Sequence, residues 1–329
     1  MSEYDVSFPA MGSDVRLLIG EPLDASLPAA EEVAGRARAY VEAFDARLSR
    51  FRPDSELCAL NADVRRGVPV SGLLRTAVEA GVWAARRSGG LVDPTLLGQL
   101  EAAGYCESRS GVAPAPLASA IDAAPARRPA QPHPARAWAR VAVDPTLGLV
   151  RRPPGLRLDT GGSGKGLCAD ALAHMLWGYS RFVVDCGGDI RIGGPAAREA
   201  PYEVEIEHPL ASVPAASVPL GSGAIATSGL RSRIWRREDG SFAHHLIDPA
   251  RGIPAWTGLI QVSAVASTAL EAETLAKAAL LSGPAGARRL LRPLGGAIVH
   301  DSGRVELVGP LARRPLLRVS VALPTGVAA

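Results

Sequence analysis

Four short turn signals, each flanked by two strand-like runs, constrain the fold more than any other feature of this sequence. They are 144–148 (DPTLG), the Gly-Gly pair at 187–188, the Asp-Gly pair at 239–240 and 301–303 (DSG). Such turns join antiparallel neighbours into hairpins, whereas parallel strands need a long and usually helical crossover. Because hairpins outnumber strand-helix-strand units, the sequence predicts an α+β fold rather than a doubly wound sheet.

Helices are predicted where apolar residues recur every three to four positions between charged ones. This pattern covers 29–48, 72–87 and 268–283, and a further helix is expected at 168–178. By contrast, Ala, Pro and Arg dominate 111–136, a composition that buries little surface, and we predict a mobile insertion that loops outward. We expect the 329 residues, 47% of them hydrophobic, to form a single domain over 1–329.

Charge and composition exclude several classes of function. A net charge of +3 and 5% aromatic residues argue against nucleic acid as a partner. The four cysteines lie far apart without a CxxC pair, so we expect free thiols and no zinc site. The N-terminal segment has neither the basic nor the apolar region of a signal peptide, and no run approaches eighteen apolar residues. We therefore expect a cytoplasmic protein without membrane insertion.

A Gly-rich loop with one lysine is the first candidate for chemistry. The segment 158–166 (LDTGGSGKG) precedes a predicted helix, so its backbone N–H groups and the helix N-terminus can face a phosphate. It is no Walker A loop, because Asp159 replaces a glycine and Gly166 replaces Ser or Thr, and Leu167 breaks the GxGxxG pattern. A tight strand-to-helix turn that needs positive φ is an equally good interpretation.

Three further segments each permit a plain structural interpretation beside a functional one. Gly187 and Gly188 let a ligand approach the backbone, or they simply form a hairpin turn. The segment 226–229 (ATSG) is either a turn or an oxyanion-binding segment. Asp93 precedes Pro94 and offers a carboxylate, or it forms an Asx turn.

Two segments contain titratable groups suited to catalysis. His245 is followed three positions later by Asp248, and an imidazole oriented by a carboxylate suits proton transfer with a hydroxyl near neutral pH. A surface histidine pair that closes a hairpin is the alternative. In the last helix, Glu273 and Lys277 are four residues apart and can meet on one face. They form either a solvated ion pair or a carboxylate in a phosphate site that holds a metal or the lysine.

In this order and spacing, the segments resemble the FAD:protein FMN transferase (ApbE) family over nearly the whole chain. The segments that carry the resemblance are 11–13 (MGS), 49–57 (SRFRPDSEL), 92–95 (VDPT), 158–170, 187–189 (GGD), 227–229 (TSG) and 245–252. The resemblance implies an α+β, ApbE-type (T-fold-like) fold of mixed sheets with packed helices. It also implies an enzyme that uses FAD and Mg²⁺, moves FMN onto a threonine hydroxyl of an acceptor flavoprotein and releases AMP.

The resemblance further implies roles for individual residues. His245 would act as general base on the attacking hydroxyl, and Gly162 would offer its backbone carbonyl to Mg²⁺. The residues expected to bind FAD lie in or beside the shared motifs, and they are Met11, Phe51, Leu91, Val92, Asp93, Asp159, Gly161, Lys165, Gly187, Gly188, Ser228 and Ile247.

One position departs from the family pattern. The family's late helix reads Ala-Asp-x-x-x-Thr with Asp and Thr as Mg²⁺ ligands, whereas this chain has Glu273 and Lys277 there. Glu273 can still bind a metal, but a charged lysine has three donors and no acceptor, so it cannot bind Mg²⁺. Two hypotheses follow. Either the ammonium takes over the electrostatic role of the metal beside Glu273, or the chain binds or hydrolyses FAD without transferring FMN.

Overall fold

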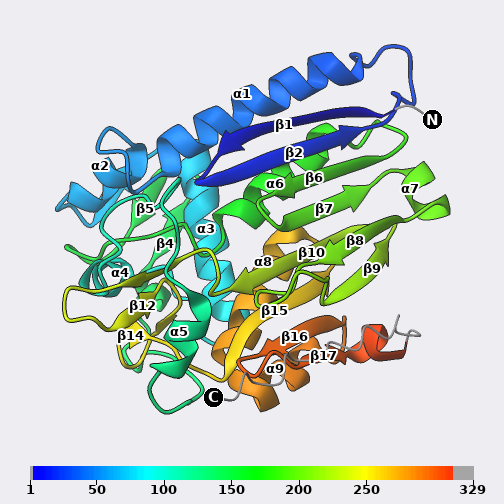
Figure 1. Cartoon of the computed structure of the whole chain (residues 1–329). Coiled ribbons are helices and arrows are strands. Elements are labelled where there is room, and N and C mark those ends of the chain that lie inside the picture. Colours follow the sequence, from blue (N-terminus) through cyan, green and yellow to red (C-terminus); the bar gives the residue numbers. More distant parts are fainter. Residues whose placement is uncertain (1–2, 314–329) are drawn as a thin grey trace, which may run out of the picture.

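An eight-stranded antiparallel sheet forms the centre of the protein (Figure 1). The computed structural model describes residues 3–313. The strand order along the sheet is β1 (Tyr4–Ala10), β2 (Ser13–Ile19), β6 (Phe182–Cys186), β7 (Asp189–Gly193), β10 (Gly223–Gly229), β15 (Leu259–Ala266), β16 (Gly296–His300) and β17 (Val305–Val308). The predicted α+β class is confirmed, because each neighbouring pair in this sheet is antiparallel.

All four predicted hairpins are present. Two of them, β6–β7 and β16–β17, belong to the central sheet. The other two lie outside it, and they pair β4 (Ala142–Asp144) with β5 (Leu149–Arg151) and β11 (Ile234–Arg236) with β12 (Phe242–His244). Gly240 in the last of these turns has φ of +79°, a conformation that glycine adopts without strain.

Helices cover one face of the sheet. Three of them, α1 (Ala30–Leu48), α6 (Gly164–Met175) and α8 (Ala269–Leu281), pack on the strands, and α3 (Gly72–Arg87) packs against all three (Figure 1). Along β10, Ala224 and Ala226 join the cluster beneath the helices while Ile225 joins a cluster on the opposite face. This alternation is the two-residue period of a strand, and the small alanines allow α8 to approach closely.

The opposite face carries a smaller layer. It consists of the hairpin of β8 (Tyr202–Ile206) and β9 (Ala216–Leu220) together with α7 (Pro195–Glu199). The remaining elements are α2 (Glu56–Ala62), β3 (Gly67–Pro69), α4 (Leu97–Ala102), α5 (Leu117–Asp122), η1 (Ala137–Arg140), β13 (Ile247–Asp248), β14 (Ile253–Pro254), α9 (Gly283–Leu291) and η2 (Gly309–Arg313).

The crossing of α6 and α8 is fixed at two points. A Cβ added to Gly166 would lie 2.6 Å from the backbone oxygen of Ala269, so only glycine permits this approach. One turn further along α6, the carboxylate of Asp170 accepts the N–H groups of Ala269 and Leu270 at 2.8 and 2.9 Å. It therefore caps the N-terminus of α8 from the neighbouring helix. These contacts set the relative position of the two helices.

One sequence-based expectation is wrong. The segment 111–136 does not loop outward throughout, because Leu117, Ala120 and Ala130 are buried in an apolar cluster with residues of β15 and α8; its mobility stays a prediction. Of the two interpretations left open for 226–229, the turn is excluded, because these residues belong to β10, which pairs with β7 on one side and β15 on the other. Within 3–313, no helix is both long and apolar enough to cross a membrane.

Candidate active site

A cavity of about 790 Å³ lies where one end of the central sheet meets the N-terminus of α6. Its walls come from the turns after β1 and β6, the end of β10, the Gly-rich loop, the side of α8, and the segment between β12 and β13. Loops after α1 and α3 complete it. The cavity is of the size that holds a small-molecule ligand.

Two tight turns lie side by side at this end of the sheet. Met11 and Gly12 have φ of +52° and +69° between β1 and β2, and Gly187 has φ of +63° between β6 and β7. A Cβ at Gly187 would lie only 2.4 Å from the hydroxyl of Ser13, so the two turns pack closely because Gly187 lacks a side chain. The backbone at Gly187 is consequently held at the cavity wall.

Lys165 points from the start of α6 to these turns. Its Nζ lies 2.8 Å from Oδ2 of the buried Asp189 and donates a hydrogen bond of 3.0 Å to the carbonyl of Gly187. Burial alone would lower the pKa of Lys165, but the nearby carboxylates of Asp189 and Glu273 outweigh it and raise the pKa. Burial raises the pKa of Asp189 to about 6, and Lys165 opposes this increase. Lys165 is therefore a firmly charged cation.

A second ammonium–carboxylate pair lies on α8. Lys277 Nζ is 3.1 Å from Glu273 Oε1 and donates a hydrogen bond of 2.8 Å to the carbonyl of Gly162. The other carboxylate oxygen of Glu273 accepts the N–H of Gly166 at 2.9 Å. The predicted meeting of Glu273 and Lys277 on one helix face is confirmed, and Glu273 is buried rather than solvated, with 2% of its side chain exposed.

His245 faces the cavity from the segment after β12. Its Nδ1 lies 3.4 Å from the backbone oxygen of Arg233. Because a carbonyl only accepts, this contact favours the Nδ1–H tautomer and leaves the Nε2 lone pair free. Burial, and after it the charge of Arg233, lower the pKa of His245 well below its usual value. The imidazole is therefore neutral at physiological pH and can accept a proton.

The expected orienting carboxylate of His245 is not Asp248. Asp248 Oδ1 instead accepts the N–H groups of Gln131 and Ala250 at 3.2 and 3.1 Å. The chain bends at His245, between β12 and β13, so His245 and Asp248 do not belong to one regular strand. The alternative of a surface histidine pair is also wrong, because His244 is fully buried.

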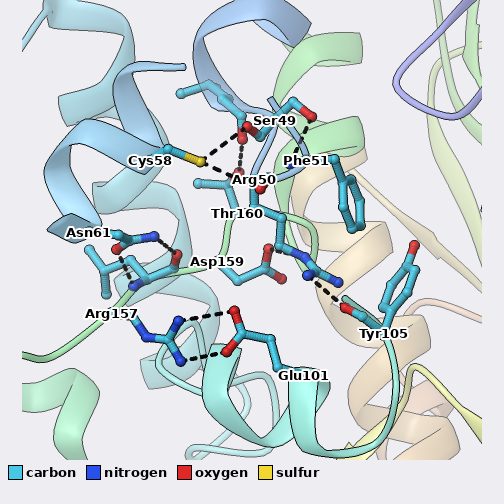
Figure 2. Close-up of polar contacts among 12 residues, drawn as sticks. Ser49, Arg50, Phe51, Cys58, Asn61, Glu101, Tyr105, Arg157, Asp159 and Thr160 are labelled. Carbon is cyan, nitrogen blue, oxygen red and sulfur yellow. Dashed lines mark hydrogen bonds and ion pairs between the residues drawn. The ribbon is translucent and has the colours of Figure 1, made fainter. Parts of the chain in front are cut away.

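An arginine flanked by aromatic rings borders another part of the cavity (Figure 2). The guanidinium of Arg50 lies 4.1 Å from the ring centre of Phe51 and 4.4 Å from that of Tyr105. Its Nε is 3.4 Å from Asp159 Oδ1, and its Nη1 donates to the backbone oxygen of Tyr105 at 2.8 Å. Burial raises the pKa of Asp159, and Arg50 counteracts it.

The strand-like segment before the Gly-rich loop is fixed by side chains from two helices (Figure 2). Asn61 of α2 bonds both the N–H and the carbonyl of Leu158, at 2.7 and 2.8 Å. Glu101 of α4 holds Arg157 through two contacts of 3.0 and 2.6 Å. These contacts determine where Asp159 enters the cavity.

The structure brings nearly all predicted site residues together. The following line the cavity: Met11, Phe51, Leu91, Val92, Asp93, Asp159, Gly161, Gly162, Lys165, Gly187, Ser228, His245, Ile247, Glu273 and Lys277. Gly188 does not line it, because its N–H is turned to the carboxylate of Asp185 at 2.7 Å. Asp93 also forms the Asx turn, accepting from the N–H and hydroxyl of Thr95 at 2.8 and 2.6 Å.

Sequence reasoning missed several side chains at or behind the cavity wall. Among them are Arg50, Tyr105, Asp189 and Arg233. Arg50 has a sequence signal, since it stands beside Phe51 in a recognised motif. Arg233 has none, because only the folded hairpin brings it to Tyr105, whose hydroxyl it contacts at 2.9 Å.

Comparison with known proteins gives consistent results. The model of the ApbE family matches residues 11–299. The FAD:protein FMN transferase of Treponema pallidum (strain Nichols) is 31% identical over 262 residues, which are 76% of this chain and 71% of the relative. That of Klebsiella pneumoniae (strain 342) is 31% identical over 278 residues, 82% of this chain and 76% of the relative.

Solved structures share the fold. The ApbE protein of Thermotoga maritima aligns with a TM-score of 0.75 at 22% identity, covering 93% of this chain and 97% of that protein. The apo form of the flavinyl transferase ApbE of Pseudomonas stutzeri aligns with a TM-score of 0.73 at 22% identity, covering 93% and 95%.

Proposed function

Because this chain belongs to the ApbE family, we propose that it acts as an FAD:protein FMN transferase and that the cavity beside α6 is its active site. The observation that carries the proposal is that Lys165, Lys277 and the neutral His245 line one cavity. Two ammonium groups suit the diphosphate of FAD, and an uncharged imidazole suits the removal of a proton from an attacking hydroxyl.

The reaction proceeds by displacement at phosphorus. The Oγ of the acceptor threonine forms a bond to the phosphorus of the FMN half, the bond from that phosphorus to the oxygen bridging to AMP breaks, and AMP leaves. His245 Nε2 takes the hydroxyl proton, while the hydrogen bond of Nδ1 to Arg233 holds the ring. Lys165 stabilises negative charge on the diphosphate oxygens as the bond breaks.

The remaining predicted FAD-binding residues, except Gly188, also line the cavity. Phe51, Met11 and Ile247 supply apolar surface for the flavin or adenine rings, while Asp159 supplies a carboxylate acceptor. Asp159 is positioned for this role because Arg50 holds it and its N–H donates to the Pro94 carbonyl at 2.8 Å.

The Mg²⁺ implied by the family resemblance does not fit the residues present. The carbonyl of Gly162 and Oε1 of Glu273 both already contact Lys277 Nζ, at 2.8 and 3.1 Å. Mg²⁺ requires oxygen ligands at about 2.0–2.1 Å in an octahedron, and an ammonium cannot serve as one. No step of the reaction is therefore assigned to a metal.

A second candidate function is the hydrolysis of FAD, because Lys277 stands where the family pattern has a metal ligand. A cavity that binds the diphosphate without a metal can admit water in place of the threonine hydroxyl, and His245 would then activate water. In that case, AMP and FMN appear as free products without an acceptor protein.

The test is to incubate the chain with FAD and a candidate acceptor flavoprotein and to record the intact mass of the acceptor. Transfer predicts a gain of one FMN unit together with AMP release, and neither product when the acceptor carries Thr→Val at the target position. AMP release that is equal without acceptor indicates the hydrolase. An acceptor of unchanged mass with no AMP formed in either mixture contradicts both functions.

The proposal includes a cytoplasmic site of action, which the four free thiols support. Cell fractionation with an antibody against this chain tests it. Recovery in the cytoplasmic fraction is expected, and recovery outside the cytoplasm would contradict this part of the proposal.

A further inference from the structure

The two ammonium groups of the cavity are the only lysines in the chain. Of its 36 lysine and arginine residues, all but Lys165 and Lys277 are arginines. Both lysines line the same cavity, and each is bound to one backbone carbonyl and one buried carboxylate. A chain that otherwise uses arginine thus has lysine at the two places where a compact cation is needed.

The ammonium group of Lys277 lies in a position that suits a compact cation. Its Nζ lies between the Gly162 carbonyl on the Gly-rich loop and Glu273 on α8, with only 13% of the side chain exposed. An ammonium has three donors, of which these two contacts use two. The third is available to a ligand in the cavity that Lys277 lines.

The surroundings hold the ammonium firmly and disfavour a divalent cation. Glu273 has its second oxygen bonded to Gly166 at 2.9 Å, so the carboxylate cannot easily turn. A dication here would face Lys165 and Lys277 together, and like charges at close range in a buried site repel strongly. Within 3–313, no group of three or more His, Cys, Asp or Glu residues could hold a metal ion.

We propose that Lys277 is a built-in cation of this active site, which binds the diphosphate of FAD directly and makes both binding and FMN transfer independent of divalent metal. The inference rests on the proposed function. During the displacement at phosphorus, Lys277 donates a hydrogen bond to a non-bridging oxygen and keeps its proton, so the atoms transferred are those already described. Lys277 thereby contributes charge stabilisation that another enzyme could obtain from a metal.

Calorimetric titration with FAD, in EDTA and again in Mg²⁺, tests the proposal without measuring turnover. The unmodified chain should bind FAD with equal affinity in both buffers. Lys277→Met should lose about 10- to 100-fold in affinity in both, the value of a hydrogen bond to a charged group. Lys277→Arg, the matched control that keeps the charge, should lose affinity as well because a planar guanidinium does not fit between Gly162 and Glu273.

Lys277→Thr distinguishes the ammonium from a metal most sharply. With the ammonium removed, Glu273, the Gly162 carbonyl and a hydroxyl are all free oxygen ligands, so FAD binding should be weak in EDTA and recover in Mg²⁺. If instead the unmodified chain gains tenfold or more in affinity on addition of Mg²⁺, the proposal is overturned. Absence of FAD binding in both buffers would refute the proposed function itself, and this inference with it.

A spectroscopic measurement on the unmodified chain covers the case in which the variants do not fold. Protein labelled with ¹³Cε-lysine should give two lysine signals, because the chain has two lysines. FAD added in EDTA should shift both signals, and Mg²⁺ added afterwards should shift neither. If either signal fails to respond to FAD in EDTA, the two ammonium groups do not both contact the diphosphate and the proposal fails.

Discussion

Gly166→Ala tests whether the close crossing of α6 and α8 positions the two lysines. A Cβ at residue 166 would lie 2.6 Å from the oxygen of Ala269 and 2.8 Å from Cα of Leu270, whereas ordinary contacts begin at 3.4 Å. These are backbone atoms, so no side chain can rotate away. The helices must separate by roughly 0.8 Å, since a packed interior has no free space to absorb the methyl group.

The expected cost has a structural and a functional part. Overpacking of this kind lowers the free energy of unfolding by about 1–3 kcal/mol. The separation also weakens the hydrogen bond from Gly166 to Glu273 and moves Lys165 away from Lys277. Because a misplacement of about 1 Å can reduce a rate by about 10²-fold, FMN transfer should fall by up to that factor.

Urea denaturation and transfer assays of two variants make the measurement. The matched control is Gly35→Ala in α1, where an added Cβ meets nothing within 4 Å. That variant should be more stable by roughly 0.5–1 kcal/mol, because alanine favours a helix over glycine, and its transfer rate should not change. If Gly166→Ala proves as stable and as active as the unmodified chain, the crossing does not position the lysines as described.

Three further outcomes are expected. His245→Gln should retain its affinity for FAD in calorimetry, but its rate of FMN transfer should be about 10²–10⁴-fold lower. Since burial lowers the pKa of His245, the transfer rate of the unmodified chain should stay level as the pH falls through 6.5. A transfer rate that is halved near pH 6.5 would contradict this. Burial lowers the pKa of His244 to about 3, so between about pH 6.5 and pH 3 the unfolded chain binds a proton that the folded chain does not. As the pH is lowered through that window, the free energy of unfolding should decrease by up to about 1.4 kcal/mol per pH unit. The decrease should be smaller in His244→Gln. In urea titrations, Asp170→Ala should be less stable by about 1–3 kcal/mol, because the N–H groups of Ala269 and Leu270 lose their acceptor. Asp170→Asn retains one acceptor oxygen and should be destabilised less. Equal stability of the two variants would exclude the capping role.

Local signals in the sequence were sufficient for the four predicted hairpins and the four predicted helices. They did not reveal the short helices α2, α4, α5 and α7, the helix α9, or the hairpins β1–β2 and β8–β9. The turn at 239–240 needs a residue with positive φ, which the glycine of an Asp-Gly pair readily adopts. This hairpin therefore does not depend on distant residues. The helix α3 is likewise predictable from nearby residues, because its apolar residues recur at helical spacing. Some helix bounds differ by a few residues: α6 runs from Gly164 to Met175 rather than over 168–178, and α8 ends at Leu281 rather than at residue 283.

The sequence-based predictions failed where contacts between distant parts of the chain determine the local structure. Segment 111–136 buries Leu117 and Ala130 because β15 and α8 provide an apolar surface that composition does not reveal. Asp248 was paired with His245 from spacing alone, whereas its carboxylate binds the backbone N–H groups of Gln131 and Ala250. For residues 226–229 the sequence left a turn and an oxyanion-binding segment open, and only the pairing with strands on both sides excludes the turn.

The candidate site was predictable as a set of segments but not as a set of contacts. The Gly-rich loop, His245 and the late helix could be recognised from the residues, and the structure places them around one cavity. The ion pair of Lys165 with Asp189 joins α6 to β7, and the contact of Lys277 with Gly162 joins α8 to the loop. Neither contact follows from spacing in the sequence, because each depends on how the helices lie on the sheet.

A crystal structure of this chain with FAD, grown in EDTA, tests the central claim most directly. It should place the diphosphate between the start of α6 and the side of α8, with its oxygens within hydrogen-bonding distance of both ammonium groups and His245 facing the FMN phosphorus. A dinucleotide whose diphosphate lies away from residues 165 and 277, or outside this cavity altogether, would contradict the account.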